Sequence, residues 1–564
     1  MERKKSNILS HRPESIIFIF LIGLVSVLLN FTFSHNSFAE YKATLSASVN
    51  EDTAAIDGTE IIESSDETAE HAINLKVKTT NKTGYTATIS SKTEETALLN
   101  TNPAITTKIS SISSVSSLSN LPANTWGYSF NANTNFNPIP ALSTPANLIH
   151  TTEKSTSEEN HTIKLGMKLN SSLKPGNYEN KLIISVVSNP YTPKAVMTEG
   201  PDFNSKLKSL ETATDKIEHF KKSTVAPAIS MNAVNIEDEE SDYEIKLWLD
   251  PADKTAYYYT EPEKVYLNED SSEMFYTEYY EQEIKNILEI DLSNFDTSQV
   301  TNMREMFYDM HNLTALDLSN FDTSKVTDMS SMFYRVSNLT TLDLSNFDTS
   351  QVTDMNRMFY VMHNLTALDL SNFDTSKVTN MGYMFRDMHN LTSLNLSSFD
   401  TSKVTNMIDM FTNIYNLTTL DLSNFNTSNV TNMDGMFTGM HSLTTLDLSN
   451  FDTSQVTDMS DMFEYMSNLT TLDLSNFDTS QVTDMNHMFY LEDKNILKDK
   501  LEKIYVNNDF NTSQLTGFSN MFGNRRKLRG GAGSFLTDPS TADKTWLSVD
   551  DPAHGRPGYF TRKP

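Results

Sequence analysis

The sequence predicts an α/β solenoid, with one short strand and one short helix in each 26-residue repeat, preceded by an all-β sandwich-like domain. Two observations support this fold class. Eight near-identical copies follow one another at a constant spacing of 26 residues over residues 292–489, and a fixed period in this range is typical of solenoid proteins. Much of residues 41–189 instead alternates apolar and polar side chains, which is the period of a strand with one buried face.

The composition excludes several classes of function. The chain of 564 residues has 73 Asp and Glu against 44 Lys and Arg, so its formal net charge is −29. A nucleic-acid binder needs the opposite balance to contact the phosphate backbone. There is no cysteine, which excludes a disulfide scaffold, a thiolate zinc site and a cysteine nucleophile. We therefore expect no nucleic-acid partner and no cysteine chemistry.

Residues 1–39 have the layout of an export signal. Four basic residues precede an apolar run over residues 16–33, and Ser37 and Ala39 offer small side chains at the −3 and −1 positions of a cleavage site. This is the pattern of a secretory signal peptide. The run is also long enough for an uncleaved N-terminal anchor, so that alternative stays open. Either way we expect an extracellular chain, and export without cysteine favours a secreted or surface-associated bacterial protein.

Residues 40–200 are expected to form the all-β domain. Ile73, Leu75 and Val77 alternate with polar residues, and Ile163 and Leu165 begin a similar set. Segments rich in Gly, Pro and Asn separate such runs, as turns between strands do. Strands with one apolar face each favour a sandwich of two sheets.

The segments around the repeats are expected to connect and close the array. Apolar residues at helical spacing predict one amphipathic helix from Asp202 to Lys222, and the acidic run 237–242 is typical of a solvated linker, so residues 201–245 form a connector. Residues 246–291 are predicted to be the N-terminal cap. Residues 490–530 hold a divergent repeat and the C-terminal cap, and residues 531–564 form a C-terminal flank.

Each repeat combines two periods. Leucines on both sides of Asp317 predict a short strand with the leucines inward and the aspartate outward. Met329, Met332 and Phe333 fall at i, i+3 and i+4, which is one face of a helix. The position before Met329 is Asp or Asn in every copy, and these residues commonly cap the start of a helix. A single copy is too small to fold alone, so the copies must stack.

The repeat core Leu-Asp-Leu-Ser-Asn-Phe-Asp-Thr-Ser-(Lys/Gln)-Val-Thr-(Asn/Asp)-Met-x-x-Met-Phe resembles the 26-residue repeat of the BspA-like leucine-rich-repeat surface proteins of bacteria. Residues 255–270 and 530–561 are similar to the flanks of that family. The resemblance implies a solenoid of leucine-rich-repeat type on the cell surface, adhesion to host or neighbouring-cell proteins for some members, and no catalysis. Many such proteins end in a sortase motif and a membrane tail, a feature that the last residues of this sequence, 562–564, do not match.

No motif points to an enzyme. The sequence contains no Gly-x-Ser-x-Gly, His-Glu-x-x-His, P-loop or dinucleotide fingerprint, so we expect neither catalysis nor a cofactor. The outward strand positions barely vary between copies, which suits a repetitive protein or glycan on another cell surface, bound by avidity. We therefore predict a monomeric adhesion protein that contacts a membrane only through an uncleaved N-terminal segment. A rigid spacer that displays the β domain is the alternative.

Two rows of equivalent residues are the nearest approach to a site. The candidates for weak calcium binding are Asp317, Asp343, Asp369, Asp421, Asp447 and Asp473. Stacking would place neighbours in this row about 4.8 Å apart, where carboxylates repel one another. A second row contains Asp322 and its equivalents. Turn hydrogen bonds would offset the repulsion in the second row, and water and salt would screen the first. The alternative is calcium, bound with a dissociation constant of ~10⁻⁴–10⁻³ M.

Histidines also share one repeat position. These residues are His311, His363, His389 and His441, whereas other copies have Ser or Tyr there. Copies of one ancestral surface residue explain the row, and a histidine metal ladder is the alternative.

Overall fold

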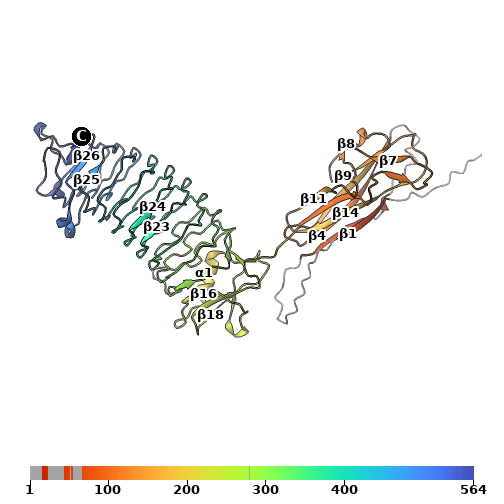
Figure 1. Cartoon of the computed structure of the whole chain (residues 1–564), viewed down its shortest axis with the longest axis horizontal. Helices are drawn as coiled ribbons and strands as arrows, with labels where there is room; N and C mark the ends of the chain where they lie inside the picture. The colour runs from red at the N-terminus through yellow and green to blue at the C-terminus, as the bar shows by residue number, and fades with distance from the viewer. Residues whose placement is uncertain (1–15, 23–42, 51–52, 55–66, 279) are drawn as a thin grey trace, which may run out of the picture. The chain divides into compact units, whose positions relative to one another are not determined.

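The computed structural model describes residues 16–22, 43–50, 53–54, 67–278 and 280–564. These residues form two compact units that divide between Thr192 and Pro193, and both are visible in Figure 1. The second unit therefore begins before the boundary at residue 200 that the sequence predicts. We describe each unit by itself.

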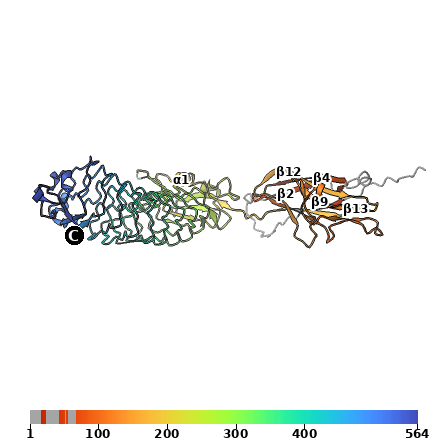
Figure 2. The ribbon, with the colours of Figure 1, turned by 90° about the horizontal axis from the view of Figure 1, so that it is seen from above.

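The N-terminal unit consists of two main sheets. The first has the strand order β11 (Asn147–Thr151), β5 (Tyr85–Ser91), β14 (Lys181–Ser188), β1 (Ile16–Ile22), β3 (Thr53–Ala54). The second has the order β13 (Tyr178–Glu179), β6 (Leu98–Asn100), β7 (Lys108–Ser111), β9 (Thr125–Phe130), β12 (Thr156–Leu169), β4 (Glu67–Thr79), β2 (Leu45–Val49). A small two-stranded sheet of β8 (Ser116–Ser117) and β10 (Asn135–Phe136) and the 3₁₀ turn η1 (Leu118–Asn120) lie beside them. Figure 2 shows β9, β12, β4 and β2 of the larger sheet.

The two sheets of this unit share one hydrophobic core. Ile73 and Leu75 on β4 and Ile163 on β12 are completely buried together with Ile89 on β5 and Ile184 on β14. The alternating pattern thus directs one face of each strand inward, because successive side chains of a strand point to opposite faces.

The segment predicted as an export signal is only partly described. Ile16–Ile22 forms β1, which pairs in parallel with β14 so that Ile17 lies opposite Lys181. The rest of residues 1–39, including the predicted cleavage site, lies outside the described residues. None of the helices in the described part of the chain has the length and apolar character needed to cross a membrane.

The start of the second unit corrects one prediction. The predicted helix from Asp202 to Lys222 is too long, because α1 (Gly200–Ser209) ends early and His219–Lys222 forms strand β16. Beyond the helix, the hydroxyl of Thr212 accepts the backbone N–H of Asp215 at 3.0 Å, and such local bonds compete with helical ones. In the acidic run 237–242, Glu239 and Glu240 are exposed, whereas Asp242 is buried and accepts the N–H of Lys194 at 2.8 Å.

Two sheets cover the first coil of the repeat array. One has the order β17 (Val234–Asn235), β18 (Lys246–Asp250), β19 (Thr255–Tyr259), β16, β21 (Glu289–Ile290), and the other β15 (Ala195–Val196), β20 (Val265–Tyr266), β22 (Phe295–Asp296). The 3₁₀ turn η2 (Ile229–Met231) precedes β17. Strands β21 and β22 belong to the first repeat region, so the cap and the array form one continuous core.

The repeats stack as successive coils of 26 residues, and this period is confirmed by their register. Parallel bridges join Asn302 to Asp328, Asp328 to Asp354, and so on to Asp484 and Gly517. The leucine segments form regular ladders at β23 (Ala367–Asp369) with β24 (Ser393–Asn395), and at β25 (Thr471–Asp473) with β26 (Lys503–Val506) and β27 (Phe560–Arg562). Short 3₁₀ turns η3 (Asp493–Lys498), η4 (Pro539–Thr541), η5 (Lys544–Trp546) and η6 (Pro552–His554) lie in the C-terminal part.

The predicted α/β solenoid of leucine-rich-repeat type is wrong, because the described repeats contain no helix. The methionine-rich segment runs through successive turns, and Glu305 and Asp309 adopt left-handed φ values of 57° and 58°. Alternate N–H groups leave the segment for the next coil: those of Met303, Glu305 and Phe307 donate to carbonyls of Asp328, Ser330 and Met332 at 3.0–3.1 Å. A helix would close these bonds within the segment.

The side chains of each coil nevertheless occupy the core. Met303, Met306 and Phe307 and their equivalents are completely or almost completely buried. The ring of Phe411 stacks between those of Phe385 and Phe437, with centroids 5.7 and 5.9 Å away. The spacing i, i+3, i+4 therefore marks the buried positions correctly, but a chain of turns presents them inward as well as a helix does.

Polar side chains join neighbouring coils at the leucine segments. The hydroxyl of Thr323 donates to the carbonyl of Asp348 at 2.9 Å and accepts the N–H of the same residue at 2.8 Å. The amide of Asn346 donates to the carbonyls of Leu318 and Phe321, both at 2.9 Å. Thr323 is 1% exposed, so its hydroxyl joins the backbone of Asp348 to the buried side of the neighbouring coil.

A buried ion pair closes the C-terminal end. Arg525 and Asp499 have side chains 1% exposed, and their atoms Nη1 and Oδ1 lie 3.1 Å apart. The guanidinium also donates to the carbonyls of Phe463 and Met466. The guanidinium thus provides hydrogen-bond donors for carbonyl groups of the last coils, because no further full repeat follows to do so.

Replacing Phe411 by alanine is expected to lower the free energy of unfolding by ~3–5 kcal/mol, because its place between two rings leaves a cavity that collapses poorly. Denaturant unfolding of the full chain measures this change. The control Asp421→Asn alters an exposed residue of the same coil and should change stability by about 0.5 kcal/mol or less. Equal stability of the two variants would contradict the stacked core.

Candidate functional site

A shallow groove crosses three consecutive coils. It encloses about 610 Å³ and is lined by residues 314–317, 340–345 and parts of 366–372, which are the same short segment of each coil. Thr340, Thr341 and Asp343 of the middle coil are exposed, whereas Leu344 points into the core. The groove therefore presents hydroxyl and carboxylate groups in rows.

The predicted first row of aspartates lies along this face. Oδ1 of Asp317, Asp343 and Asp369 accepts the backbone N–H of the serine two residues later, each at 3.0 Å. Asp421, Asp447 and Asp473 do the same at 2.9–3.0 Å. These backbone hydrogen bonds hold the pKa of Asp317, Asp343 and Asp369 below its ordinary value. Each aspartate thus closes a local turn.

Neighbours in the row come within reach of one another. The amide of Asn395, which takes the place of an aspartate in one coil, donates to Oδ1 of Asp369 at 2.9 Å. At the C-terminal end Lys563 pairs with Asp473 at 2.7 Å. An amide and an ammonium group therefore relieve the repulsion at these two places without a metal ion.

The second row is engaged in the same way. Oδ1 of Asp322 accepts the N–H of Ser324 at 3.0 Å and its hydroxyl at 2.6 Å. Both bonds lower the pKa of Asp322, the hydroxyl more than the N–H. Among the described residues, the groups whose three ligand atoms lie within 4.8 Å of one another contain no member of either aspartate row. The geometry of the rows favours hydrogen-bonded turns over calcium sites.

A cluster of acidic residues lies in the turn segments and was not found from the sequence. Asp461 and His487 of consecutive coils approach to 3.5 Å between Oδ1 and Nδ1, and Glu464 lies near both. Burial and neighbouring carboxylates raise the pKa of Asp434 to about 6 and that of Glu464 to about 7. No repeated sequence pattern indicates this cluster, because the residues at the turn positions differ from copy to copy.

The histidine row forms an aromatic stack. The rings of His363 and His389 lie 4.3 Å apart, and Tyr415 continues the stack 4.5 Å from His389 and 5.2 Å from His441. Nδ1 of His363 and of His441 contacts a backbone carbonyl of the next coil at 2.8 Å. His311 instead contacts the carbonyl of Asp309 at 3.0 Å. Stacked rings with backbone partners differ from a ladder of metal ligands.

The repeat region is similar to one known family. The family described as Mycoplasma protein of unknown function, DUF285, matches residues 269–387, 361–446 and 441–547. The matched stretches begin in the N-terminal cap and end beyond the divergent repeat, so the DUF285 similarity spans the array but not the N-terminal unit. No curated protein and no solved structure matches the chain.

Calcium is expected to leave the thermal midpoint unchanged, because the aspartate rows already accept hydrogen bonds from their own turns. The measurement compares unfolding of the full chain in several millimolar calcium and in chelator at matched ionic strength. A rise in calcium that disappears in the double variant Asp343→Asn, Asp369→Asn would contradict this expectation, since a ligand that binds only the folded state stabilises it.

Asp434→Asn is expected to stabilise the protein at pH 8 and to have little effect at pH 4. The folded pKa of Asp434, about 6, exceeds that of an unfolded aspartate, ~3.9. The stability that the protonated carboxyl of Asp434 contributes is therefore fully present at low pH. It is lost as the pH rises through the folded pKa, because the unfolded aspartate ionises more readily. Thermal midpoints at both pH values test this. The control Asp421→Asn should show no such gain at pH 8, and a gain independent of pH in Asp434→Asn would count against the cause.

Proposed function

We propose that this chain is a non-enzymatic bacterial protein, secreted or held at the cell surface, which adheres to a repetitive protein or glycan on another cell. The supporting observation is the groove, whose hydroxyl and carboxylate rows repeat from coil to coil. The repeat core also resembles that of BspA-like surface proteins, some of which are adhesins, and we extend that resemblance to the role of this chain. The export-like layout of residues 1–39 supports the location.

Uniformity of the groove supports a ligand that repeats along its length. A face shaped for one folded partner would differ between coils, whereas exposed Thr314, Thr340 and Thr366 are identical in three of them. Each coil offers a few hydrogen bonds, which are individually weak in water. A ligand that repeats along its length engages several coils at once, and its overall affinity then exceeds that of one contact by orders of magnitude.

A deletion of whole repeats tests adhesion against the spacer alternative. Removing residues 344–395 takes out two periods and joins Asp343 to Leu396, so the register of the stack is kept. We expect binding of the full chain to intact partner cells to fall about 10-fold or more, because avidity depends on the number of contacts. Flow cytometry with labelled protein measures it. Unchanged binding would support a spacer that displays the N-terminal unit.

A pair of point variants then locates the surface. Thr341→Arg places a long side chain in the groove, whereas Gln351→Arg adds the same charge at an exposed position that is Lys in other copies. We expect the first variant to weaken cell binding and the second to leave it unchanged. Equal effects of both would exclude the groove as the adhesive face.

A further inference from the structure

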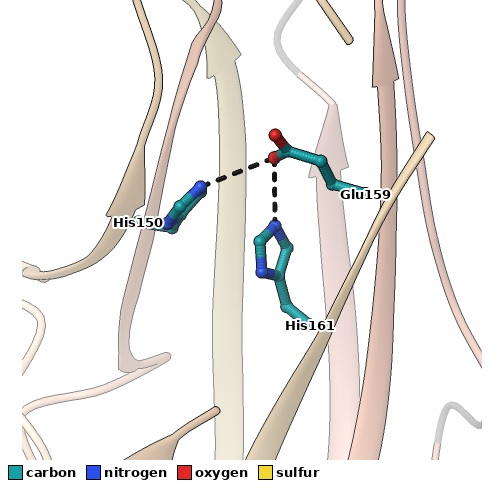
Figure 3. Close-up of side chains that lie close together, drawn as sticks. All are labelled: His150, Glu159 and His161. Atoms are coloured by element: carbon teal, nitrogen blue, oxygen red, sulfur yellow. Dashed lines mark hydrogen bonds and ion pairs between the residues drawn. The ribbon is translucent and has the colours of Figure 1, made fainter. Parts of the chain in front are cut away.

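Two histidines and a glutamate converge between the sheets of the N-terminal unit. His150 lies on β11 of the first sheet, and Glu159 and His161 lie on β12 of the second. Glu159 and His161 are two residues apart, so their side chains point to the same face of the strand. Figure 3 shows both imidazole rings directed at one carboxylate. The cluster therefore links two sheets that have no strand pairing at this point.

The distances match those between the ligands of one metal ion. Nε2 of His161 and Nε2 of His150 lie 3.3 and 3.5 Å from the same atom, Oε2 of Glu159. In a tetrahedral zinc site with bonds of about 2.0–2.1 Å, two ligand atoms are about 3.3–3.4 Å apart. All three ligand atoms lie within 4.8 Å of one another, so small rotations of the side chains bring them around one ion.

We propose that His150, Glu159 and His161 bind a Zn²⁺ ion that joins the two sheets of the N-terminal unit. Two imidazoles and one carboxylate are a ligand set that zinc accepts, with water in the fourth position. The side chains of the three residues are 30%, 27% and 7% exposed, so the site is sheltered but reachable by an ion. The proposal is independent of the adhesive role of the repeats.

The protonation of the cluster suits a cation. The imidazoles of His150 and His161 lie side by side next to the carboxylate of Glu159. Two rings whose centroids lie 4.4 Å apart disfavour the doubly charged pair by repulsion. A metal ion supplies the positive charge that the glutamate attracts while both imidazoles stay neutral, as zinc ligands must.

Outer residues hold the ligands in place. The hydroxyl of Tyr85 donates to Oε2 of Glu159 at 2.6 Å and also lies 2.7 Å from Nε2 of His161, a contact that zinc on Nε2 would replace. Nδ2 of Asn131 lies 3.3 Å from Nδ1 of His161. Such outer contacts fix the orientation of metal ligands. Zinc on Nε2 places the proton of His161 on Nδ1, so Asn131 must turn its Oδ1 towards the ring while that oxygen still accepts the N–H of Thr162.

Zinc retention by the untagged full chain tests the site. Protein stripped with a chelator, given a small excess of Zn²⁺ and passed through gel filtration is expected to retain one zinc per chain and to unfold at a higher temperature than the stripped protein. His150→Gln should weaken zinc binding about 100-fold and abolish both effects. His487→Gln removes a ligand of the other close group, Asp461, Glu464 and His487, and should change neither.

Three results would overturn the assignment. Retention of zinc by His150→Gln shows an adventitious ion only, loss of zinc in His487→Gln places the ion in the repeats, and failure of the wild type to retain zinc excludes the site. Circular dichroism of both variants establishes that each is folded before zinc is measured.

Asn131→Asp provides a second, opposite test. A carboxylate accepts the Nδ1–H of metal-bound His161 without the rotation that the amide needs, so this variant is expected to bind zinc about 10-fold more tightly, in the range of outer-residue effects. Competition with a chromophoric chelator measures the affinity. Equal or weaker binding would contradict the proposed orientation of His161.

Discussion

The hydroxyl of one buried threonine in each coil is the contact on which the repeat unit depends. Thr375 donates to the carbonyl of Asp400 at 2.9 Å and accepts its N–H at 2.8 Å, and the same pair of bonds recurs along the stack. Where the leucine segments do not form a regular ladder, this hydroxyl makes the hydrogen bonds to the next coil that a neighbouring strand would otherwise make. A buried backbone group left without a partner costs about 1–3 kcal/mol, so every coil relies on the next one for its own polar groups.

This dependence explains why the exposed face is uniform and the turn segments are not. The Asn-Phe-Asp-Thr-Ser segment carries the hydrogen bonds between coils, and its neighbours on the leucine segment are therefore held in a fixed register. The turn segments bond through backbone atoms, as between Phe411 and Met436 at 3.0 Å, so their outward side chains are free to vary. That freedom allows the acidic cluster near Asp461 and the stack of His363 and His389 to form in some coils only. Repetition of the groove and variety of the turns are two results of one scaffold.

The sequence predicts the repeat boundaries and the buried positions well, because both follow from periodicity. It fails on the conformation of the methionine segment, since the spacing of Met329, Met332 and Phe333 is compatible with a helix and with a chain of turns. Left-handed φ values at positions such as Ser331 make the segment a chain of turns, and the residue types at these positions do not predict them. The aspartate row was found, but its Asx turns were predicted only for the second row. The cluster of His150, Glu159 and His161 forms across two sheets, and contacts between distant strands leave no local signal.

Removal of one threonine hydroxyl tests this account most directly. Thr401 donates to and accepts from Asn426 at 2.8 Å and is completely buried. We expect Thr401→Val to lower the free energy of unfolding by about 2–4 kcal/mol in denaturant titration, because the backbone N–H and carbonyl of Asn426 both lose the hydroxyl that joins them to the neighbouring coil. Thr401→Ser keeps the hydroxyl and should be less damaging, and the exposed Thr419→Val should have little effect. Equal stability of Thr401→Val and the wild type would contradict the claim that side-chain bonds between coils hold the array together.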